Sequence, residues 1–249
     1  MIHIKNISKI YNKGNEDEVS ALKDVSIEIP QGEFVVIIGT NGSGKSTMLN
    51  LLLGTQTPTQ GNIVVNNNDI TALPEYKRSK WVSMVFQNPA HGTAPDLSIL
   101  ENFRLASLRA GNKKLSIGIN DAFRKKVEEK VASLGMGLEK KLEQPMGSLS
   151  GGQRQALTLL MGVMDKTDIL LMDEPTAALD PKSSQVVMQL ADKINKELGI
   201  TIVLVTHSMK DALHYGNRLL MFHGGTILRD LNGTDKSQLQ LSSLQEWFS

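Results

Sequence analysis

The stretch GTNGSGKST, Gly39–Thr47, decides the fold of this 249-residue chain. It fits the pattern G-x-x-x-x-G-K-[ST], whose fixed positions are Gly39, Gly44, Lys45 and Ser46. The apolar segment EFVVIIG precedes it and STMLNLLLG follows, which predicts a buried strand, a tight loop and a helix. A strand, a glycine-rich loop and a helix in this order predict a phosphate-binding loop of the P-loop NTPase kind.

The chemistry of such a loop explains its composition. Glycines let the backbone curl so that successive N–H groups point at one centre, and the following helix adds partial positive charge. We expect Lys45 to reach the β- and γ-phosphates of a nucleotide and the Ser46 hydroxyl to ligate Mg²⁺. An ordinary glycine turn is the alternative, and both motif and context disfavour it. The residues expected to contact a nucleotide are Gly39, Thr40, Asn41, Gly42, Ser43, Gly44, Lys45, Ser46 and Thr47.

The bulk composition excludes several classes of protein. A hydrophobic content of 40% and a charged content of 21% indicate a soluble packed protein. The net charge of +1 gives no global field to attract nucleic acid, and the lack of cysteine excludes disulfides, thiolate metal ligands and cysteine nucleophiles. No apolar run approaches the roughly 20 residues that cross a bilayer, and no signal peptide is visible. A role at a membrane would therefore require docking on another protein.

Hydrophobic patterning predicts the remaining architecture. MIHIKNISKIY and ALKDVSIEIPQG alternate apolar and polar residues, which predicts an antiparallel β layer. DLSILENFRLASLRAG and DAFRKKVEEKVASLGM carry apolar residues at helical spacing. DILLMDEP and ITIVLVTH read as buried strands around the helix SSQVVMQLADKINKEL, which indicates parallel α/β topology, and RLLMFHGGTILRDL predicts an alternating hairpin.

These patterns lead us to expect one α/β domain over residues 1–249, a P-loop NTPase with a parallel sheet core. The core and the N-terminal antiparallel β subdomain are expected to span residues 1–88 and 166–249. An α-helical subdomain is expected to be inserted over about residues 89–165.

Two carboxylates and a histidine follow buried strands. Asp173 and Glu174 end ILLMDEP, and side chains at such strand ends face the crevice of an open α/β sheet. We expect Asp173 to lie in the Mg²⁺ shell and Glu174 to orient or deprotonate the attacking water. A solvated strand end is the alternative, which the phosphate loop disfavours. His207 ends a second buried strand, in VLVTHS, and is expected near the γ-phosphate.

A second anion-binding pattern occurs in LSGGQRQALTLLMGVM, Leu149–Met164. Its serine and glycines stand ahead of an apolar run that could form one buried helix. A hydroxyl and glycine amides at a helix N-terminus make a weak anion site. One chain thus carries two phosphate-binding patterns.

Six motifs in order resemble the nucleotide-binding subunit of ATP-binding-cassette (ABC) transporters over nearly the whole chain: GTNGSGKST, FQNP, LSGGQ, ILLMDEP, AALD and VTHS. The resemblance implies ATP and Mg²⁺ as cofactors. It also implies a homodimer formed on ATP binding, in which each ATP lies between the phosphate loop of one protomer and LSGGQ of the other. The residues of that second half-site are Ser150, Gly151, Gly152 and Gln153.

The resemblance assigns further roles one residue at a time. Tyr11 matches an aromatic residue that stacks on adenine; a tyrosine packing on its own sheet is the alternative. Gln87 matches the residue that links Mg²⁺ and the attacking water to the helical subdomain. Asp180 matches the loop that touches the partner protomer, and His207 matches the histidine that contacts the γ-phosphate.

A narrower resemblance lies between Gln87 and Gly111, in QNPAHGTAPDLSILENFRLASLRAG. It is similar to ATPase components of bacterial uptake systems for tryptophan and tyrosine. That branch implies uptake of a small solute, with integral-membrane permease subunits and a substrate-binding lipoprotein as partners and without nucleic acid. It also implies a peripheral position on the cytoplasmic face of a bacterial membrane. Segment 87–111 is the expected docking face.

Other functions were weighed against this one. A soluble ABC ATPase of translation or DNA repair is disfavoured by the single cassette, the lack of a coiled-coil insertion and the small net charge. A module that holds ATP without hydrolysing it is disfavoured by Glu174 and His207. An exporter ATPase stays an alternative, because export and import cassettes share these motifs.

Overall fold

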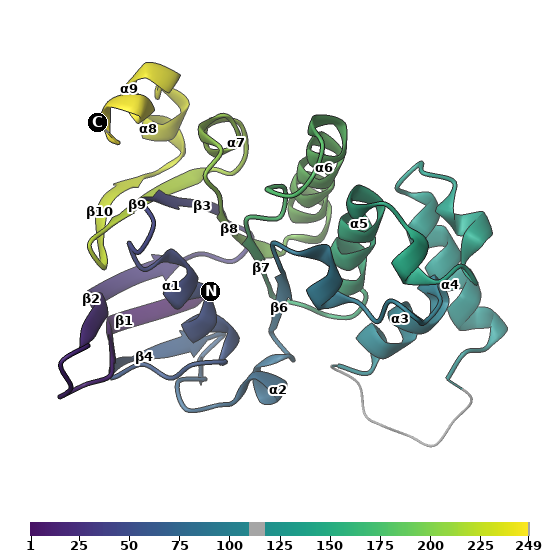
Figure 1. The fold of residues 1–249 in the computed structure, drawn as a ribbon, viewed down its shortest axis with the longest axis horizontal. Helices are drawn as coiled ribbons and strands as arrows, with labels where there is room; N and C mark the ends of the chain where they lie inside the picture. The colour runs from purple at the N-terminus through teal and green to yellow at the C-terminus, as the bar shows by residue number, and fades with distance from the viewer. Residues whose placement is uncertain (110–117, 249) are drawn as a thin grey trace.

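The computed structural model of the chain describes residues 1–109 and 118–248 (Figure 1). Its N-terminal part is an antiparallel sheet of strand order β2-β1-β4-β5, which confirms the predicted β layer. The strands are β1 (Ile2–Tyr11), β2 (Val19–Ile29), β4 (Gln60–Val65) and β5 (Asn68–Asp69). Asn66 and Asn67 have positive φ and close the β4–β5 hairpin, where asparagine tolerates this conformation best among residues with a side chain.

The second sheet has six strands in the order β10-β9-β3-β8-β7-β6. They are β3 (Phe34–Gly39), β6 (Val82–Val85), β7 (Ile169–Asp173), β8 (Thr201–Val205), β9 (Arg218–His223) and β10 (Thr226–Leu231). All neighbours are parallel except β9 and β10, so the parallel core is confirmed. The predicted hairpin is present, but the predicted alternation of buried and exposed residues is wrong for β9. Residues 219–222 are all buried, because β9 pairs with β3 inside the sheet and is covered on both faces.

The parallel sheet forms a middle layer between two hydrophobic clusters. Phe34, Val36 and Ile38 of β3 face one cluster, and the alternate Val35 and Ile37 face the other. The first cluster includes α5 (Gly151–Gly162), α6 (Pro181–Leu198), α7 (Met209–His214) and the C-terminal α9 (Leu241–Glu246), which follows α8 (Gly233–Ser237). The second cluster holds α1 (Lys45–Leu53) between the two sheets.

Between β6 and β7 the described residues form helices and no strand, as the patterning predicted (Figure 1). The helices are α3 (Ile99–Ser107), α4 (Asp121–Ala132) and α5, with 3-10 turns at Pro89–Gly92, Leu138–Lys141 and Met146–Ser148. Ser98 and Glu101 form a capping box at the start of α3. The end of the first predicted helix, at Ala110 and Gly111, lies outside the described residues. The subdomain boundaries stay predictions.

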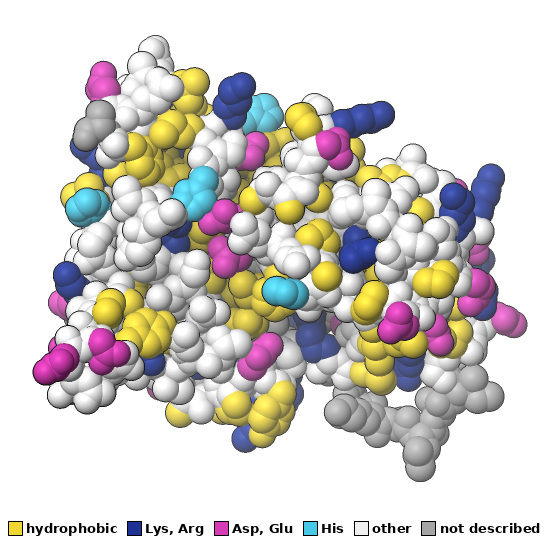
Figure 2. All heavy atoms as spheres, viewed as in Figure 1, with side chains coloured by type: hydrophobic (Ala, Val, Ile, Leu, Met, Phe, Trp, Pro, Cys, Tyr) yellow, Lys and Arg dark blue, Asp and Glu magenta, His cyan; other side chains and the backbone are white. Residues whose placement is uncertain are grey.

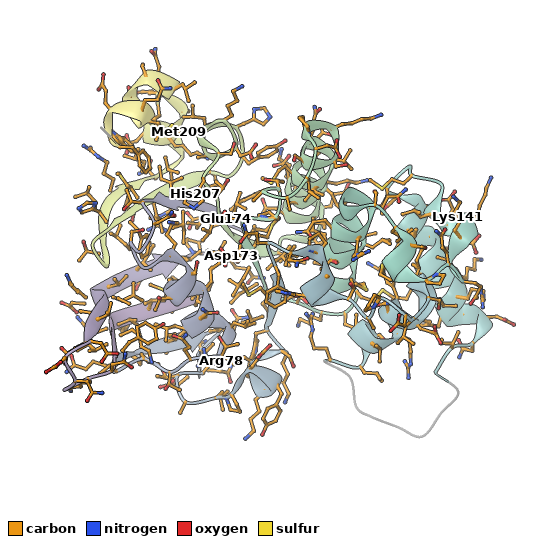
Figure 3. The ribbon with its side chains drawn as sticks, viewed as in Figure 1. Arg78, Lys141, Asp173, Glu174, His207 and Met209 are labelled. Carbon is orange, nitrogen blue, oxygen red and sulfur yellow. The ribbon has the colours of Figure 1, made fainter. Side chains whose placement is uncertain are left out.

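A buried arginine fixes the C-terminal end of α1 (Figure 3). Arg78, the last residue of α2 (Glu75–Arg78), is fully buried and donates to the carbonyls of Leu51 and Leu52 in the last turn of α1. It also donates to two carbonyls of the loop before α2. Gly54 ends α1 at φ 90°, and a Cβ there would lie 2.7 Å from the Arg78 Nε. The cation neutralises the negative end of the helix whose other end is the phosphate loop.

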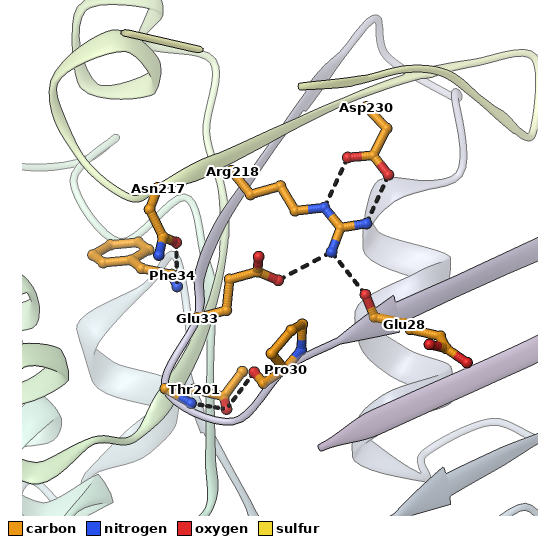
Figure 4. A network of polar contacts seen from close by, with 9 residues as sticks. Glu28, Pro30, Glu33, Phe34, Thr201, Asn217, Arg218 and Asp230 are labelled. Carbon is orange, nitrogen blue, oxygen red and sulfur yellow. Dashed lines mark hydrogen bonds and ion pairs between the residues drawn. The ribbon is translucent and has the colours of Figure 1, made fainter. Parts of the chain in front are cut away.

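A second arginine joins the two sheets (Figure 4). Arg218 of β9 donates to both carboxylate oxygens of Asp230 at 2.7 Å. It also donates to the Glu28 carbonyl at the end of β2 at 2.7 Å and to Glu33 at 3.0 Å. The bonds to Asp230 and Glu33 raise the pKa of Arg218. This network holds the antiparallel sheet against the parallel core.

Candidate nucleotide site

The phosphate loop joins β3 to α1, as predicted, and its glycines are required by geometry. Gly39, Gly42 and Gly44 have φ of 155°, 75° and 103°. A Cβ at Gly39 would lie 2.3 Å from the Phe222 carbonyl oxygen, and a Cβ at Gly44 would lie 2.6 Å from that of Ala21. No side chain caps α1, which leaves its first amides without a side-chain acceptor, as an anion site at a helix N-terminus requires.

Lys45 begins α1 with its side chain buried inside the loop. Its Nζ donates to the carbonyl oxygens of Gly39 and Thr40 at 2.8 Å each. Burial lowers the pKa of Lys45, and the nearby Glu174 and Asp173 partly offset that effect. A fixed cation thus stands between the loop backbone and a pair of carboxylates.

Asp173 ends β7 beside the start of α1. Burial raises the pKa of Asp173, as does the neighbouring Glu174, while Lys45, His207 and a hydrogen bond from Ser46 act in the opposite direction. The pairing of the Ser46 hydroxyl with a carboxylate suits Mg²⁺, which takes few protein oxygens and completes its shell with phosphate and water. The structure therefore brings together the two side chains predicted to share a metal ion.

Glu174 and His207 lie against each other just beyond the ends of β7 and β8 (Figure 3). The distance from the Glu174 Oε1 to the His207 Nε2 is 2.8 Å. Glu174 adopts φ 46°, a left-handed conformation that costs a non-glycine residue about 1 kcal/mol or more. Its N–H donates to the Val205 carbonyl at 2.9 Å, which holds the turn. Figure 2 shows acidic side chains beside a histidine near the middle of this face.

Tyr11 lies at the same site. A cavity of about 260 Å³ is lined by Tyr11, Val19, Ala21, Glu174, His207 and residues 41–47. The Tyr11 hydroxyl donates to Gln56 and lies 3.5 Å from the Thr47 hydroxyl, and the Lys9 Nζ lies 5.0 Å from the ring centroid. The tyrosine is thus anchored at the mouth of the phosphate loop; its stacking on adenine stays a prediction.

The LSGGQ residues lie elsewhere. Ser150, Gln153 and Asp180 line a separate cavity of about 510 Å³, which has no lining residue in common with the phosphate-loop cavity. Gln87 is exposed beyond the end of β6 and is also not among the described residues that line the phosphate-loop cavity. One chain therefore brings the loop, Asp173, Glu174, His207 and Tyr11 together, and does not bring the LSGGQ half-site to them.

The N-termini of α5 and α6 share the second cavity because the two helices pack closely. A Cβ at Gly152 would lie 2.3 Å from the Ser183 Oγ, so glycine allows this approach. Ser150 and Gln153 form a capping box at 3.3 and 3.2 Å, and Gly151 and Ser150 are exposed. Asp180 caps α6 by accepting from two backbone amides. Helix α5 is buried along the core, as predicted.

Sequence reasoning missed Gln155, which is fully buried in α5. Its amide nitrogen donates to the Phe86 carbonyl at 2.9 Å and the Pro175 carbonyl at 3.0 Å. Its position in the sequence could have indicated burial, because Gln155 lies about one turn after Gly152 and one turn before Leu159, on the face of the helix that carries apolar residues.

A parallel sheet that carries a phosphate loop and a carboxylate–histidine pair, under an antiparallel layer, defines a P-loop ATPase. The comparisons with known proteins specify the family. The ABC transporter family model matches residues 22–177. The chain belongs to the ABC transporter family and is an ATP-binding and ATP-hydrolysing subunit.

Individual relatives cover the whole chain. A tyrosine transport ATP-binding protein of Clostridioides difficile (strain R20291) is 41% identical over 100% of this chain and 98% of its own length. A phosphonates import ATP-binding protein of Lactococcus lactis subsp. cremoris (strain SK11) is 36% identical over 92% of each chain. A solved dimeric ATP-binding cassette of Methanocaldococcus jannaschii, in a post-hydrolysis state with ADP and Pi, has a TM-score of 0.80 at 33% identity. The match covers 94% of this chain and 99% of the solved chain.

Proposed function

We propose that this protein is the ATPase subunit of a bacterial importer for an aromatic amino acid, and that two copies close head to tail on ATP. The observation that carries the closing mechanism is the separation of the phosphate-loop cavity from the Ser150 cavity within one chain. Two half-sites in separate cavities can act on one nucleotide only if a second copy supplies the other half. The dimeric cassette among the structural neighbours supports this arrangement.

In this proposal the residues divide into two groups. One protomer binds ATP through residues 39–47, with Tyr11 against adenine and His207 against the γ-phosphate. The partner protomer closes over the γ-phosphate with Ser150, Gly151, Gly152 and Gln153, while Asp180 contacts the opposite protomer. Ser46, Asp173 and Gln87 would hold Mg²⁺, which, when bound, neutralises the phosphate charge.

Glu174 is the proposed catalytic base. Its carboxylate lies at the mouth of the phosphate loop and lines the same cavity as Lys45. There it accepts a proton from water, or orients that water, for attack on the γ-phosphate. His207 holds the carboxylate in place through its Nε2, which lies 2.8 Å from the Glu174 Oε1. Lys45 supplies fixed positive charge where charge develops on the transferred phosphoryl group.

The docking face for permease subunits is proposed on segment 87–111, on the inserted helical subdomain of residues 89–165. A cavity of about 370 Å³ opens there between this segment and β6. Leu105 is 51% exposed at its edge and offers an apolar side chain to a partner. Arg109 lines the same cavity and is anchored by the Ser83 and Thr167 hydroxyls. Gly111 lies outside the described residues.

The transported solute and the location rest on the relatives. The C. difficile protein is named for tyrosine transport, and the sequence of Gln87–Gly111 resembles that of ATPase components of tryptophan and tyrosine uptake systems. No helix in the described part of the chain is long and apolar enough to cross a membrane. We place the subunit on the cytoplasmic face of the bacterial membrane, with a permease and a substrate-binding lipoprotein as partners and without nucleic acid.

Co-purification from native membranes tests this assignment. The tagged protein should retain an integral-membrane permease and a lipoprotein whose receptor domain binds tyrosine or tryptophan. Leu105→Asp should lose the permease, whereas Leu198→Asp, which changes a similarly exposed leucine (54%) on α6, should keep it. Capture of ribosomes or DNA-repair proteins, or of a permease without any receptor, would contradict the importer assignment.

A further inference from the structure

Gln155 connects three parts of the nucleotide machinery. It lies in the second turn of α5, the helix that begins at the LSGGQ residues, and none of its surface is exposed. Its amide nitrogen donates to the carbonyls of Phe86 and Pro175 at 2.9 and 3.0 Å. Because both partners are carbonyl oxygens, only the nitrogen of the carboxamide can face them, which fixes its orientation.

The two carbonyls flank the predicted catalytic residues. The Phe86 carbonyl belongs to the peptide group that leads into Gln87. Pro175 follows Glu174, whose left-handed φ of 46° must be held by its surroundings. One side chain therefore fixes the backbone beside both residues, although they follow different strands.

The other end of the Gln155 carboxamide is left without a partner. The Gln155 Oε1 is buried and has no hydrogen-bond partner among the residues that the structure describes. An unsatisfied buried acceptor costs about 1–3 kcal/mol, so the two hydrogen bonds that the amide nitrogen donates must offset that cost. Most of the buried face of α5 is apolar, with Ala156, Leu157 and Leu159 nearby; the buried Thr158 hydroxyl is satisfied within the helix by the Arg154 carbonyl.

We propose that Gln155 is a positioning residue that makes the N-terminus of α5 move together with Gln87 and Glu174 when ATP closes the dimer. When helix α5 moves, Ser150 moves toward the partner's nucleotide. The Gln155 amide transmits that movement to the Phe86 and Pro175 carbonyls, which lie beside Gln87 and Glu174 of the same chain. A partner's ATP at Ser150 would then be sensed at Glu174 of the same chain. This inference rests on the proposed dimer.

A matched pair of variants tests the proposal. Gln155→Met keeps the length of the side chain and removes the amide. Asn195→Leu removes an equivalent contact, because Asn195 of α6 also donates from one amide to two carbonyls, those of Gly32 and Ile200, away from the site. ATP affinity of the protomer, kcat, KM and the thermal midpoint are measured for both. Dimerisation by ATP is measured with each change in a Glu174→Gln background.

For Gln155→Met we expect ATP affinity of the protomer within about twofold of the parent, with about a tenfold lower kcat and about a tenfold higher ATP requirement for dimerisation. Asn195→Leu should lower the thermal midpoint without either change. If Gln155→Met alters kcat and dimerisation no more than Asn195→Leu does, the positioning role is wrong. If Gln155→Met does not fold, Gln155→Asn, which keeps the amide on a shorter stem, takes its place with the same expectations.

Two further measurements keep this inference separate from the proposed dimer. If Glu174→Gln with Gln155 intact stays monomeric in ATP, the dimer proposal fails, and with it the sensing of the partner's ATP. Coupling between Gln155 and Gln87 is tested by combining Gln155→Met with Gln87→Ala. Losses of kcat smaller than the product of the single losses support action through the Gln87 backbone, and independent losses overturn it.

Discussion

Helices α1 and α5 both begin beside glycines, yet their N-termini differ in what satisfies their amides. Helix α1 has no side-chain cap and follows a loop whose glycines turn the backbone toward a common centre. Helix α5 begins with a closed capping box, in which Ser150 and Gln153 bond each other's backbone. The first N-terminus is built for a phosphate, whereas the second is satisfied without one.

The surroundings strengthen this difference. The α1 terminus has a buried cation, Lys45, and two carboxylates that face it from β7. The exposed Ser150 lines a cavity of its own near Asp180 and Lys182. In the proposed mechanism, one terminus of a single copy therefore binds ATP alone, and the other contributes only when a phosphate is brought against it.

Removing the proposed catalytic carboxylate has the largest expected effect. Glu174→Gln should lower kcat by about 10²- to 10⁴-fold, the usual contribution of a general base. ATP affinity should stay near that of the parent, because Lys45 and the loop amides are unchanged. Phosphate release and equilibrium ATP binding measure the two quantities. Retention of more than a tenth of the parental kcat would remove Glu174 from the role of base.

Changing one residue at each terminus sharpens the comparison. Lys45→Ala should weaken ATP binding to the protomer by about 10- to 100-fold, since a charge-assisted contact is lost. Ser150→Arg should leave that binding within about twofold and abolish hydrolysis, because it blocks only the face offered to a partner. Titration with a fluorescent ATP analogue distinguishes them. If both variants lose the same amount of ATP affinity in the single protomer, then both helix termini contribute to ATP binding within one copy and the comparison is wrong.

The packing of α5 on α6 gives a smaller effect. Gly152→Ala should destabilise the fold by about 1–3 kcal/mol, because the new Cβ meets Ser183. Ser183→Gly should recover part of that loss, since it removes the atoms in contact. Urea unfolding of the single and double variants measures the coupling. Additive losses would show that the clash is relieved elsewhere.

Replacing Asp173 has the smallest expected effect on stability, and it is expected to stabilise the fold at neutral pH. Burial raises the pKa of the Asp173 carboxyl in the folded state. The carboxyl therefore favours folding at a pH below its unfolded pKa, where it is protonated, and this contribution is lost as the pH rises through its folded pKa. Asp173→Asn should therefore melt at most a few degrees higher at neutral pH, while losing ATPase activity. At low pH the two proteins should melt alike. A lower melting temperature at neutral pH would contradict this reasoning.

The sequence predicts those features that depend on local pattern. The runs FVVII and ILLM are apolar throughout, so their burial in a parallel sheet follows from composition. The glycine spacing of 39–47 determines the loop. The left-handed turn at Glu174 and the hydrogen-bond partners of Gln155 were not predictable, because each depends on a contact with a distant segment. The burial of β9 was mistaken for the same reason: its partner β3 is remote in sequence.

Mixing two inactive proteins tests the shared site most directly. Ser150→Arg and Lys45→Ala protomers are each expected to be inactive alone. A mixed dimer has one site that carries both lesions and one that carries neither, so combining the proteins should restore ATP hydrolysis well above the sum of the separate activities. If the mixture hydrolyses no more ATP than its components, over a range of ratios, then the two helix termini do not complete one site between two copies.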